Sequence, residues 1–177
     1  MKTIAVPTRE QVSPANQGLF DNLAKNIGHV PNLFAVYAHS ENALVTYLAL
    51  SGSKTSLKAK EKEVVNLGVS QVNDCAYCLA VHTAISKMQG FTDEQIIELR
   101  RGTASFDSKL DALAKLTKSI AENKGHADEQ LVENFFSAGY NEGSLIDVVV
   151  AVGDKTITNY IYALNKIPVD FPAAPAL

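Results

Sequence analysis

Apolar residues recur along most of the chain at spacings of three and four positions, and Gly, Pro, Ser and Asp interrupt this pattern roughly every 10 to 20 residues. Such spacing places apolar side chains on one face of a helix, whereas a half-buried strand needs strict alternation. The pattern therefore predicts an all-α protein. The length of 177 residues is close to that of one domain. Because no long low-complexity linker divides the chain, we expect a single helical bundle over residues 1–177.

Residues that typically start and stop helices predict the boundaries. Ser13 followed by Pro14 favours a helix start, and Thr92 with Gln95 has the pattern of a capping box. Helices are expected to begin at or just after Ser13, Pro31, Ser40, Ser56, Asp74, Thr92, Asp107, Asp128 and Ser144. Expected ends lie at or near Gly28, Gly52, Gly90, Gly102, Gly139 and Tyr162. After the last helix, three prolines favour an extended tail from Pro168, which we expect to lie against a neighbouring subunit.

Composition and charge exclude several classes of protein. Hydrophobic residues make up 46% of the chain and charged residues 20%, as in a soluble globular protein. The net charge of -3 and the lack of a Lys or Arg run exclude nucleic acid as a partner. No apolar stretch approaches the roughly 18 residues that span a bilayer, and the stretch Met1–Pro7 is too short for a secretory leader. We therefore expect a cytoplasmic protein without membrane insertion.

The two cysteines of the chain, Cys75 and Cys78, lie three positions apart. In a reducing cytosol such a pair is more often catalytic or metal-binding than structural. If Asp74 caps the helix, the cysteines occupy positions i and i+3 of its first turn, with α-carbons about 5 to 6 Å apart. That separation permits a disulfide, which needs roughly 4.4–6.8 Å. The free N–H groups and partial positive charge of a first turn also favour thiolate over thiol.

His82 lies four residues beyond Cys78, one turn deeper on the same face, where its ring can reach the sulfur directly or through one water. An imidazole that accepts a proton is usually oriented by a carboxylate. Glu63, on the preceding helix, is the candidate, because it stands beside two apolar residues and can point inward where Glu61 points outward. Cys75, at the helix start, is expected to be the more exposed sulfur.

The stretch from Glu63 through Cys75 and Cys78 to His82 resembles the peroxidase core of the alkylhydroperoxidase D and carboxymuconolactone decarboxylase superfamily. That core has a Glu, a Cys-x-x-Cys pair and a His at this spacing. Further segments resemble the family's helix boundaries and last helix: Gly90-Phe-Thr-Asp-Glu, Arg101-Gly102, Gly139-Tyr140 and Thr158-Asn159. The resemblance implies an alkylhydroperoxidase D-like helical domain, with a redox core at about residues 56–102, that forms symmetric homo-oligomers. One position departs from the pattern, because Tyr77 stands where the best-known members have a His between the cysteines.

The resemblance also implies a role for each residue of the motif. Cys78 is expected to be the peroxidatic sulfur, Cys75 the resolving sulfur, and Glu63 with His82 a proton relay. The expected activity is that of a thiol-dependent hydroperoxidase in antioxidant defence, which forms a sulfenic acid on Cys78 and then a Cys75–Cys78 disulfide. No metal, flavin or haem cofactor is required. The expected partners are a hydroperoxide substrate and a dithiol reductant, either a protein or a lipoyl-type donor.

Other interpretations of the same residues stay open. Two thiolates, an imidazole and a carboxylate are acceptable zinc ligands, so a zinc-stabilised or redox-sensing helical module is one alternative. A decarboxylase acting on a lactone of aromatic catabolism is another, although that chemistry has no use for a cysteine pair. Taken alone, His82 is more often a core histidine and Glu63 a solvated residue. Tyr77 is expected to be a packing residue, and Asn159 either lines the site or bonds along its helix.

Overall fold

The computed structural model describes residues 4–177, and within that range it contains helices, turns and loops but no strand. The first three residues, part of the Met1–Pro7 stretch considered above for a leader, lie outside the described residues. A short 3-10 turn and nine α-helices follow one another in this range: η1 (Arg9–Gln11), α1 (Pro14–Ile27), α2 (Asn32–Tyr37), α3 (Ala43–Ser51), α4 (Ala59–Val72), α5 (Ala76–Met88), α6 (Asp93–Arg101), α7 (Ser108–Glu122), α8 (Glu129–Ser137) and α9 (Glu142–Asn165). The prediction of an all-α protein is confirmed.

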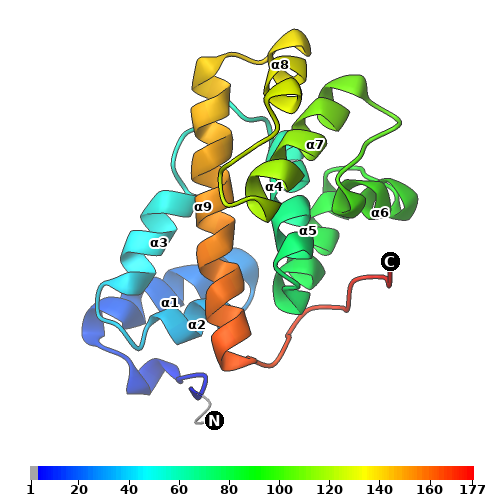
Figure 1. The fold of residues 1–177 in the computed structure, drawn as a ribbon. Helices are drawn as coiled ribbons and strands as arrows, with labels where there is room; N and C mark the ends of the chain where they lie inside the picture. Colours follow the sequence, from blue (N-terminus) through cyan, green and yellow to red (C-terminus); the bar gives the residue numbers. More distant parts are fainter. Residues whose placement is uncertain (1–3) are drawn as a thin grey trace.

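The longest helix, α9, runs through the middle of the molecule (Figure 1). The N-terminal helices α1 to α3 lie on one side of its lower half, and α4 to α8 lie on the other side. α9 contacts α2 and α3 in the first group and α4, α5 and α7 in the second. One helix therefore joins both halves of the fold, and its buried side chains reach the space between them.

The buried apolar side chains form two clusters. The aliphatic cluster is built mainly of Leu, Val and Ile from α4, α6 and α7 and from the elements that cover them: Leu57, Val64, Val65, Leu67, Val69, Leu79, Phe91, Ile96, Leu99, Ala104, Leu110, Leu113, Ala114, Leu116, Ile120, Phe135, Tyr140 and Val148. The aromatic cluster joins α1 to α3 with the start of α5: Val12, Phe20, Leu33, Ala35, Val36, Tyr37, Ala38, Leu44, Tyr47, Cys75, Tyr77, Cys78 and Ile167. Both cysteines thus belong to the aromatic cluster.

Several helix ends form as the cap residues predict. The Ser13 side chain accepts a hydrogen bond from the Asn16 N–H at the start of α1, and Thr92 and Gln95 form a capping box at the start of α6. α6 ends at Gly102, whose φ of 83° is left-handed and therefore suits glycine. These ends are local, because each depends on residues within one turn.

Three predicted helix starts outside the cysteine turn are wrong, because another residue holds the N-cap position. Ser56 bonds through both its N–H and its hydroxyl to Asp147 of α9, so α4 begins only at Ala59. Asn141 rather than Ser144 caps α9, accepting the Ser144 N–H at 2.9 Å. The Ser40 hydroxyl accepts the Ala43 N–H at 3.3 Å, but α3 begins only at Ala43, with Asn42 in the N-cap position. In the case of Ser56 a long-range bond replaces the local one.

The C-terminal tail packs on its own chain, and its expected contact with a neighbouring subunit stays a prediction. Asp170 accepts hydrogen bonds from the Tyr77 hydroxyl at 2.5 Å and from the Asn32 N–H at 2.9 Å. Further along, the guanidinium of Arg100 donates to the carbonyl of Pro175. The extended conformation is as expected, but its role is to cover the start of α5.

Among the helices in the described part of the chain, none combines the length and the apolar character needed to cross a bilayer.

Candidate active site

The first turn of α5 presents the two cysteines. Asp74 adopts a left-handed conformation with φ of 50°, which turns the chain sharply between α4 and α5. Cys75 is therefore the N-cap of α5, where the sequence predicted Asp74, and its sulfur accepts the Cys78 N–H at 3.3 Å. The Cys75 thiol also donates to Cys78 Sγ, with the two sulfurs 2.7 Å apart. A disulfide needs about 2.05 Å, so a small approach closes it.

The two sulfurs differ in what they face, not in how exposed they are. Cys75 is 1% exposed and Cys78 is 2% exposed, so the expectation that Cys75 is the more accessible is wrong. Both are covered by the aromatic cluster. Cys78, however, lines a cavity that Cys75 does not line. A substrate in that cavity therefore meets Cys78 first.

Glu63 and His82 form a buried pair, as the sequence predicted. Glu63 Oε2 lies 2.8 Å from His82 Nδ1, and Glu63 Oε1 accepts the side-chain N–H of Asn66 at 2.9 Å. Burial by itself raises the pKa of Glu63, but His82 and the two hydrogen bonds outweigh burial and hold that pKa below its usual range. Glu63 is thus an anion hydrogen-bonded at the Nδ1 edge of the imidazole.

Glu61 is also buried, contrary to the expectation that it points to solvent. Its carboxylate accepts the Lys58 N–H at the start of α4 at 2.7 Å and the Tyr140 hydroxyl at 3.0 Å. It therefore serves as a helix cap and an anchor for Tyr140. The Lys/Glu pattern of α4 could not distinguish the two glutamates, because both point inward near the start of the helix, toward different partners.

Lys155 of α9 is the site residue that sequence reasoning missed. Its Nζ lies 2.7 Å from His82 Nε2, and the residue is only 5% exposed. A signal was present in the sequence, because Lys155 stands on the same buried stripe as Val148, Thr158 and Asn159. Lysine is almost never fully buried without a partner, so a lysine on such a stripe suggests a polar site.

The sequence allowed a direct bond between His82 and the Cys78 sulfur, and the structure does not contain that bond. The two ring nitrogens of His82 are occupied by Glu63 and Lys155. His82 and Cys78 nevertheless line the same cavity, one turn apart on α5. The hydrogen bonds connect Glu63 to His82 and His82 to Lys155 of α9. Lys155 lines the same cavity as Cys78.

The environment of the pair polarises the two thiols in opposite directions. The hydrogen bond from Cys75, followed by Lys155, His82 and Asn159, lowers the pKa of Cys78 to about 6 in spite of burial. The pKa of Cys75 is raised, first because its proton is held in the bond to Cys78 and then because it is buried. At neutral pH Cys78 is therefore the thiolate and Cys75 the thiol.

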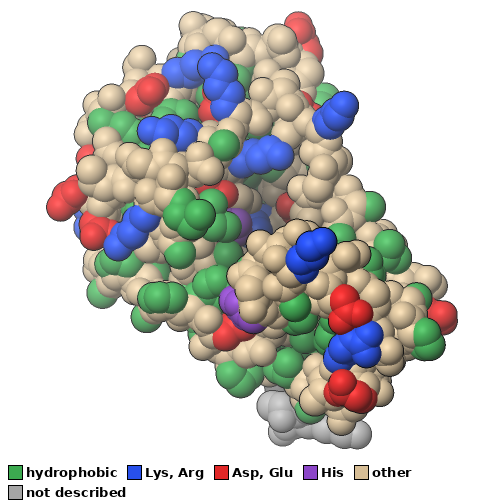
Figure 2. Space-filling model, turned by 180° about the vertical axis from the view of Figure 1, so that it is seen from behind, with side chains coloured by type: hydrophobic (Ala, Val, Ile, Leu, Met, Phe, Trp, Pro, Cys, Tyr) green, Lys and Arg blue, Asp and Glu red, His purple; other side chains and the backbone are tan. Residues whose placement is uncertain are grey.

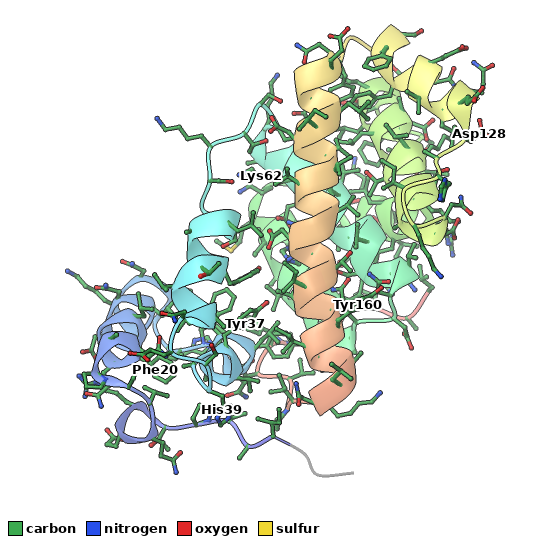
Figure 3. The ribbon with its side chains drawn as sticks, turned by 60° about the vertical axis from the view of Figure 1, so that its left-hand side comes forward. Phe20, Tyr37, His39, Lys62, Asp128 and Tyr160 are labelled. Carbon is green, nitrogen blue, oxygen red and sulfur yellow. The ribbon has the colours of Figure 1, made fainter. Side chains whose placement is uncertain are left out.

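A cavity of about 680 Å³ leads to these groups, between the N-terminal helices and α4, α5 and α9. Apolar side chains form much of its wall, including Leu33, Phe34, Val81 and Phe171. Figure 2 shows the surface hollowed on the face opposite to that of Figure 1, with apolar side chains at the border of the hollow. Lys62, which also lines the cavity, lies beside α9 in Figure 3. An organic molecule in this cavity can therefore contact apolar side chains and Cys78 at the same time.

Asn159 and Tyr77 support the cysteine turn from opposite sides. Asn159 is fully buried, bonds to Asn73 and Ser70 of the α4 end, and lowers the pKa of both thiols. Tyr77 is buried, as predicted for a packing residue, and its hydroxyl joins Asp170 and the Leu33 N–H. These contacts fix the cysteine turn between α9 on one side and α2 with the C-terminal tail on the other.

The zinc alternative finds no arrangement to support it among residues 4–177. In that part of the chain no group of three or more His, Cys, Asp or Glu side chains has the geometry to hold a metal ion. Glu63 turns its oxygens to His82 and Asn66 instead of converging with the sulfurs.

Residues 38–119, which include all four site residues predicted from the sequence, match the model of the carboxymuconolactone decarboxylase family. No curated protein sequence matches the chain. This match confirms the family resemblance inferred from the Cys-x-x-Cys motif.

Three solved structures share the fold. An uncharacterized peroxidase-related protein from Silicibacter sp. TM1040 is 20% identical, with a TM-score of 0.81, 94% of this chain covered and 90% of that chain. An alkylhydroperoxidase AhpD core protein from Ralstonia eutropha JMP134, also peroxidase-related and uncharacterized, is 16% identical with a TM-score of 0.84, covering 95% and 92%. A variant of the debrominase Bmp8 in complex with 2,3,4-tribromopyrrole is 15% identical with a TM-score of 0.77, covering 96% and 93%. At these identities the likeness shows the fold alone.

Proposed function

We propose that this chain, a relative of the carboxymuconolactone decarboxylase family, is a thiol-dependent hydroperoxidase whose attacking sulfur is Cys78. The observation that carries the proposal is the polarised cysteine pair at the end of an apolar cavity. Cys78 is the sulfur that lines the cavity and has the lowered pKa, and Cys75 holds its proton 2.7 Å away. Nucleophilic and resolving roles are therefore already separated.

The reaction proceeds in two steps that use these two sulfurs. The Cys78 thiolate attacks the terminal oxygen of the hydroperoxide, the O–O bond breaks, and Cys78 becomes a sulfenic acid while the alkoxide leaves. Cys75 then attacks the sulfur of that sulfenic acid, its thiol proton leaves with the hydroxide as water, and a Cys75–Cys78 disulfide forms. Glu63 and His82 act as the proton relay of the first step.

The cavity supports an organic hydroperoxide as the substrate. Its volume of about 680 Å³ falls within the roughly 300–1,000 Å³ of ligand pockets. Hydrogen peroxide needs neither this volume nor an apolar wall. Burial of the alkyl or aryl part stabilises binding by about 25 cal/mol for each Å² removed from water. We therefore propose an alkyl or aryl hydroperoxide.

The reductant must reach sulfurs that are almost fully buried. A slender dithiol, such as a lipoyl-type arm, fits this requirement, because it can enter the cavity and attack Cys78 of the disulfide. A dithiol carried on a rigid protein surface would need the cysteine turn to open. A reduced cysteine pair of this kind also fits the cytoplasmic location expected from the sequence.

We also propose that the chain forms the homo-oligomer expected from the sequence. Large apolar residues are exposed along one side of α9: Ile146, Val149, Val150, Ile157, Tyr160 and Leu164. Exposed apolar stripes of this kind are typical of protein interfaces. Light scattering after size exclusion measures the mass, and a monomer at all concentrations contradicts the proposal.

Reductive dehalogenation is a second candidate, favoured by the apolar cavity and by the fold shared with a debrominase. Removal of bromide from an aromatic ring and its replacement by hydrogen also takes two electrons, which the dithiol supplies as it becomes a disulfide. The two reactions therefore share the same protein product. They differ in what is released, which is an alcohol in one case and bromide in the other.

The test is to mix the reduced protein with cumene hydroperoxide and dihydrolipoamide and to follow loss of the peroxide, with Cys78→Ser as the control. We expect multiple turnovers by the wild type and none above background by the control. A parallel reaction with 2,3,4-tribromopyrrole measures bromide. Bromide release without peroxide consumption would replace the peroxidase proposal by the second candidate.

A further inference from the structure

Lys155 is a buried cation that the reaction proposed above leaves without a role. The residue is 5% exposed, its side chain lines the cavity, and it takes part in no ion pair with a carboxylate among residues 4–177. Burying an ammonium costs several kcal/mol even after the protein relaxes. A cation kept in such a place without a counter-ion is a candidate for function.

The bond to His82 defines where the protons lie. An ammonium has no lone pair, so Lys155 Nζ donates to His82 Nε2 across the 2.7 Å contact. The proton of the neutral imidazole is then on Nδ1, where it donates to Glu63 Oε2 at 2.8 Å. His82 has no N–H left for a ligand. Lys155 has two, because its hydrogen bonds within the described residues account for only one of three.

The charged neighbours of Lys155 leave it free to act on a ligand. Of the carboxylates that line the cavity, Glu63 is occupied by His82 and Asn66, and Asp147 by Ser56. Asp154, the third carboxylate in the cavity wall, precedes Lys155 in α9 but forms no ion pair with it, and its Oδ1 is buried without a hydrogen-bond partner. The other nearby charge of interest is the Cys78 sulfur, whose pKa Lys155 lowers. Lys155 therefore lines the same cavity as the Cys78 sulfur and is bonded to the relay.

We propose that Lys155 is a catalytic residue with two tasks: its ammonium stabilises the Cys78 thiolate, and it gives a proton to the oxygen that leaves when the O–O bond breaks. The inference rests on the proposed hydroperoxidase function. It deepens that function, because it identifies the acid that protonates the product. The two N–H groups of Lys155 that have no acceptor among the described residues are the donors to the leaving oxygen.

The proton balance of the step is complete. The thiol proton of Cys78 resides on the His82–Lys155 pair before the substrate binds. When Cys78 attacks, the bond between sulfur and the terminal oxygen forms, the O–O bond breaks, and the electron pair remains on the leaving oxygen. Lys155 gives that oxygen its proton, so that an alcohol departs and a neutral amine remains. The net change is thiol plus hydroperoxide to sulfenic acid plus alcohol.

Two substitutions separate the two tasks. Lys155→Met removes both the charge and the acid, and it should fold because it removes a buried charge. Lys155→Arg keeps the charge, but a guanidinium almost never gives up its proton. Lys118→Met is the control, because Lys118 lies outside the cavity and donates to the Arg101 carbonyl. All three are tested in the full chain with both cysteines reduced.

The first readout is the rate at which iodoacetamide alkylates Cys78, measured against pH by mass spectrometry without any peroxide. Lys155→Met should shift the midpoint of this profile to higher pH, whereas Lys155→Arg and Lys118→Met should leave it near that of the wild type. An unchanged profile in Lys155→Met would overturn the stabilising task. This result does not depend on peroxidase activity.

The second readout compares two oxidants in single turnovers, above the midpoint of every variant. Cumene hydroperoxide releases an alkoxide that needs a proton, whereas peracetic acid releases a carboxylate that does not. Loss of a general acid should slow the first reaction on the order of 10²–10⁴-fold in both Lys155 variants and change the second far less. Equal slowing of both oxidants would overturn the donor task.

The outcomes keep the two proposals apart. If the wild type reduces neither oxidant, the hydroperoxidase function fails and the donor task with it, while the alkylation profile still decides the stabilising task. If the wild type is active and Lys155→Met behaves like Lys118→Met in both readouts, the assignment of Lys155 is wrong and the proposed function stands.

Discussion

The aliphatic and the aromatic cluster differ in what a single side chain does. In the aliphatic cluster, α4, α6 and α7 contribute many Leu, Val and Ile side chains. Each of them makes the same kind of apolar contact as its neighbours. In the aromatic cluster, Cys75 and Cys78 form a specific contact between their sulfurs, and Tyr77 donates a specific hydrogen bond to Asp170. Stability is therefore distributed over one region and chemistry concentrated in the other.

The position of α9 explains how the regions cooperate. It packs on α4 and α7 of the aliphatic side and on α2 and α3 of the aromatic side. Lys155 lies in the middle of this helix, so the rigid packing of one region fixes a charge beside the sulfurs of the other. Figure 3 shows Tyr37 of the aromatic cluster on the side of the N-terminal helices that faces α9.

The largest expected effect separates chemistry from stability. Cys78→Ser should abolish consumption of cumene hydroperoxide, whereas Cys75→Ser should allow one turnover and leave a sulfenic acid on Cys78, because Cys75 acts only in the second step. Dimedone labelling followed by peptide mass spectrometry identifies the oxidised residue. Thermal unfolding serves as the control. A sulfenic acid trapped on Cys75 in the complementary variant would reverse the assignment.

A substitution in the aliphatic cluster should have the opposite effect, lowering stability without changing the thiol chemistry. Leu113 is fully buried, and Leu113→Ala should lower the free energy of unfolding by about 2–5 kcal/mol, because it removes apolar contact and leaves a cavity. The alkylation profile of Cys78 should stay where it is. Urea denaturation and iodoacetamide labelling measure the two quantities on the same sample. A shift in the thiol profile would show that the clusters are not independent.

A smaller effect ranks the contributions to the thiolate. In the wild type, alkylation of Cys78 should rise through pH about 6, because a lowered pKa keeps the sulfur ionised above that value. Cys75→Ala should raise the midpoint most, followed by Lys155→Met and then His82→Ala, since the hydrogen bond outweighs either neighbour. Cys75→Ser keeps a donor and is the control. A larger shift in His82→Ala than in Cys75→Ala would contradict this order.

The smallest expected effect concerns the tail. Tyr77→Phe removes the hydroxyl that donates to Asp170, so the free energy of unfolding should fall by about 1–3 kcal/mol. Tyr162→Phe is the matched control, because the Tyr162 ring packs on Tyr77 and its hydroxyl makes no hydrogen bond within residues 4–177. Hydrogen exchange at residues 168–175 should increase in the first variant only. Equal exchange in both would show that the bond does not hold the tail.

The same contrast explains what the sequence could predict. Periodicity and local caps predicted all the helices, because those signals act within one or two turns, as at Ser13 and Thr92. Starts at Ser56 and Asp74 were wrong because a bond to Asp147 and a left-handed turn override the local preference. Helix lengths and apolar helix faces depend on local sequence, whereas these two helix starts depend on the tertiary structure.

The candidate site was predictable only where its residues share a motif. Glu63, Cys75, Cys78 and His82 have a recognisable spacing, and the structure brings Glu63 to His82 and Cys75 to Cys78. Lys155 lies 73 positions from His82, so no spacing rule connects them. The burial of Cys75 was missed for a similar reason, because the residues that cover it come from α1 to α3 and from the tail.

The measurement that tests the central claim most directly is the mass of the fully reduced protein before and after one equivalent of cumene hydroperoxide, with peptide mapping. The account predicts that the protein loses two hydrogen atoms in mass, that Cys75 and Cys78 appear in one disulfide-linked peptide, and that a dithiol restores the original mass. An unchanged mass, or an oxygen added at a methionine with both thiols still free, would contradict the account.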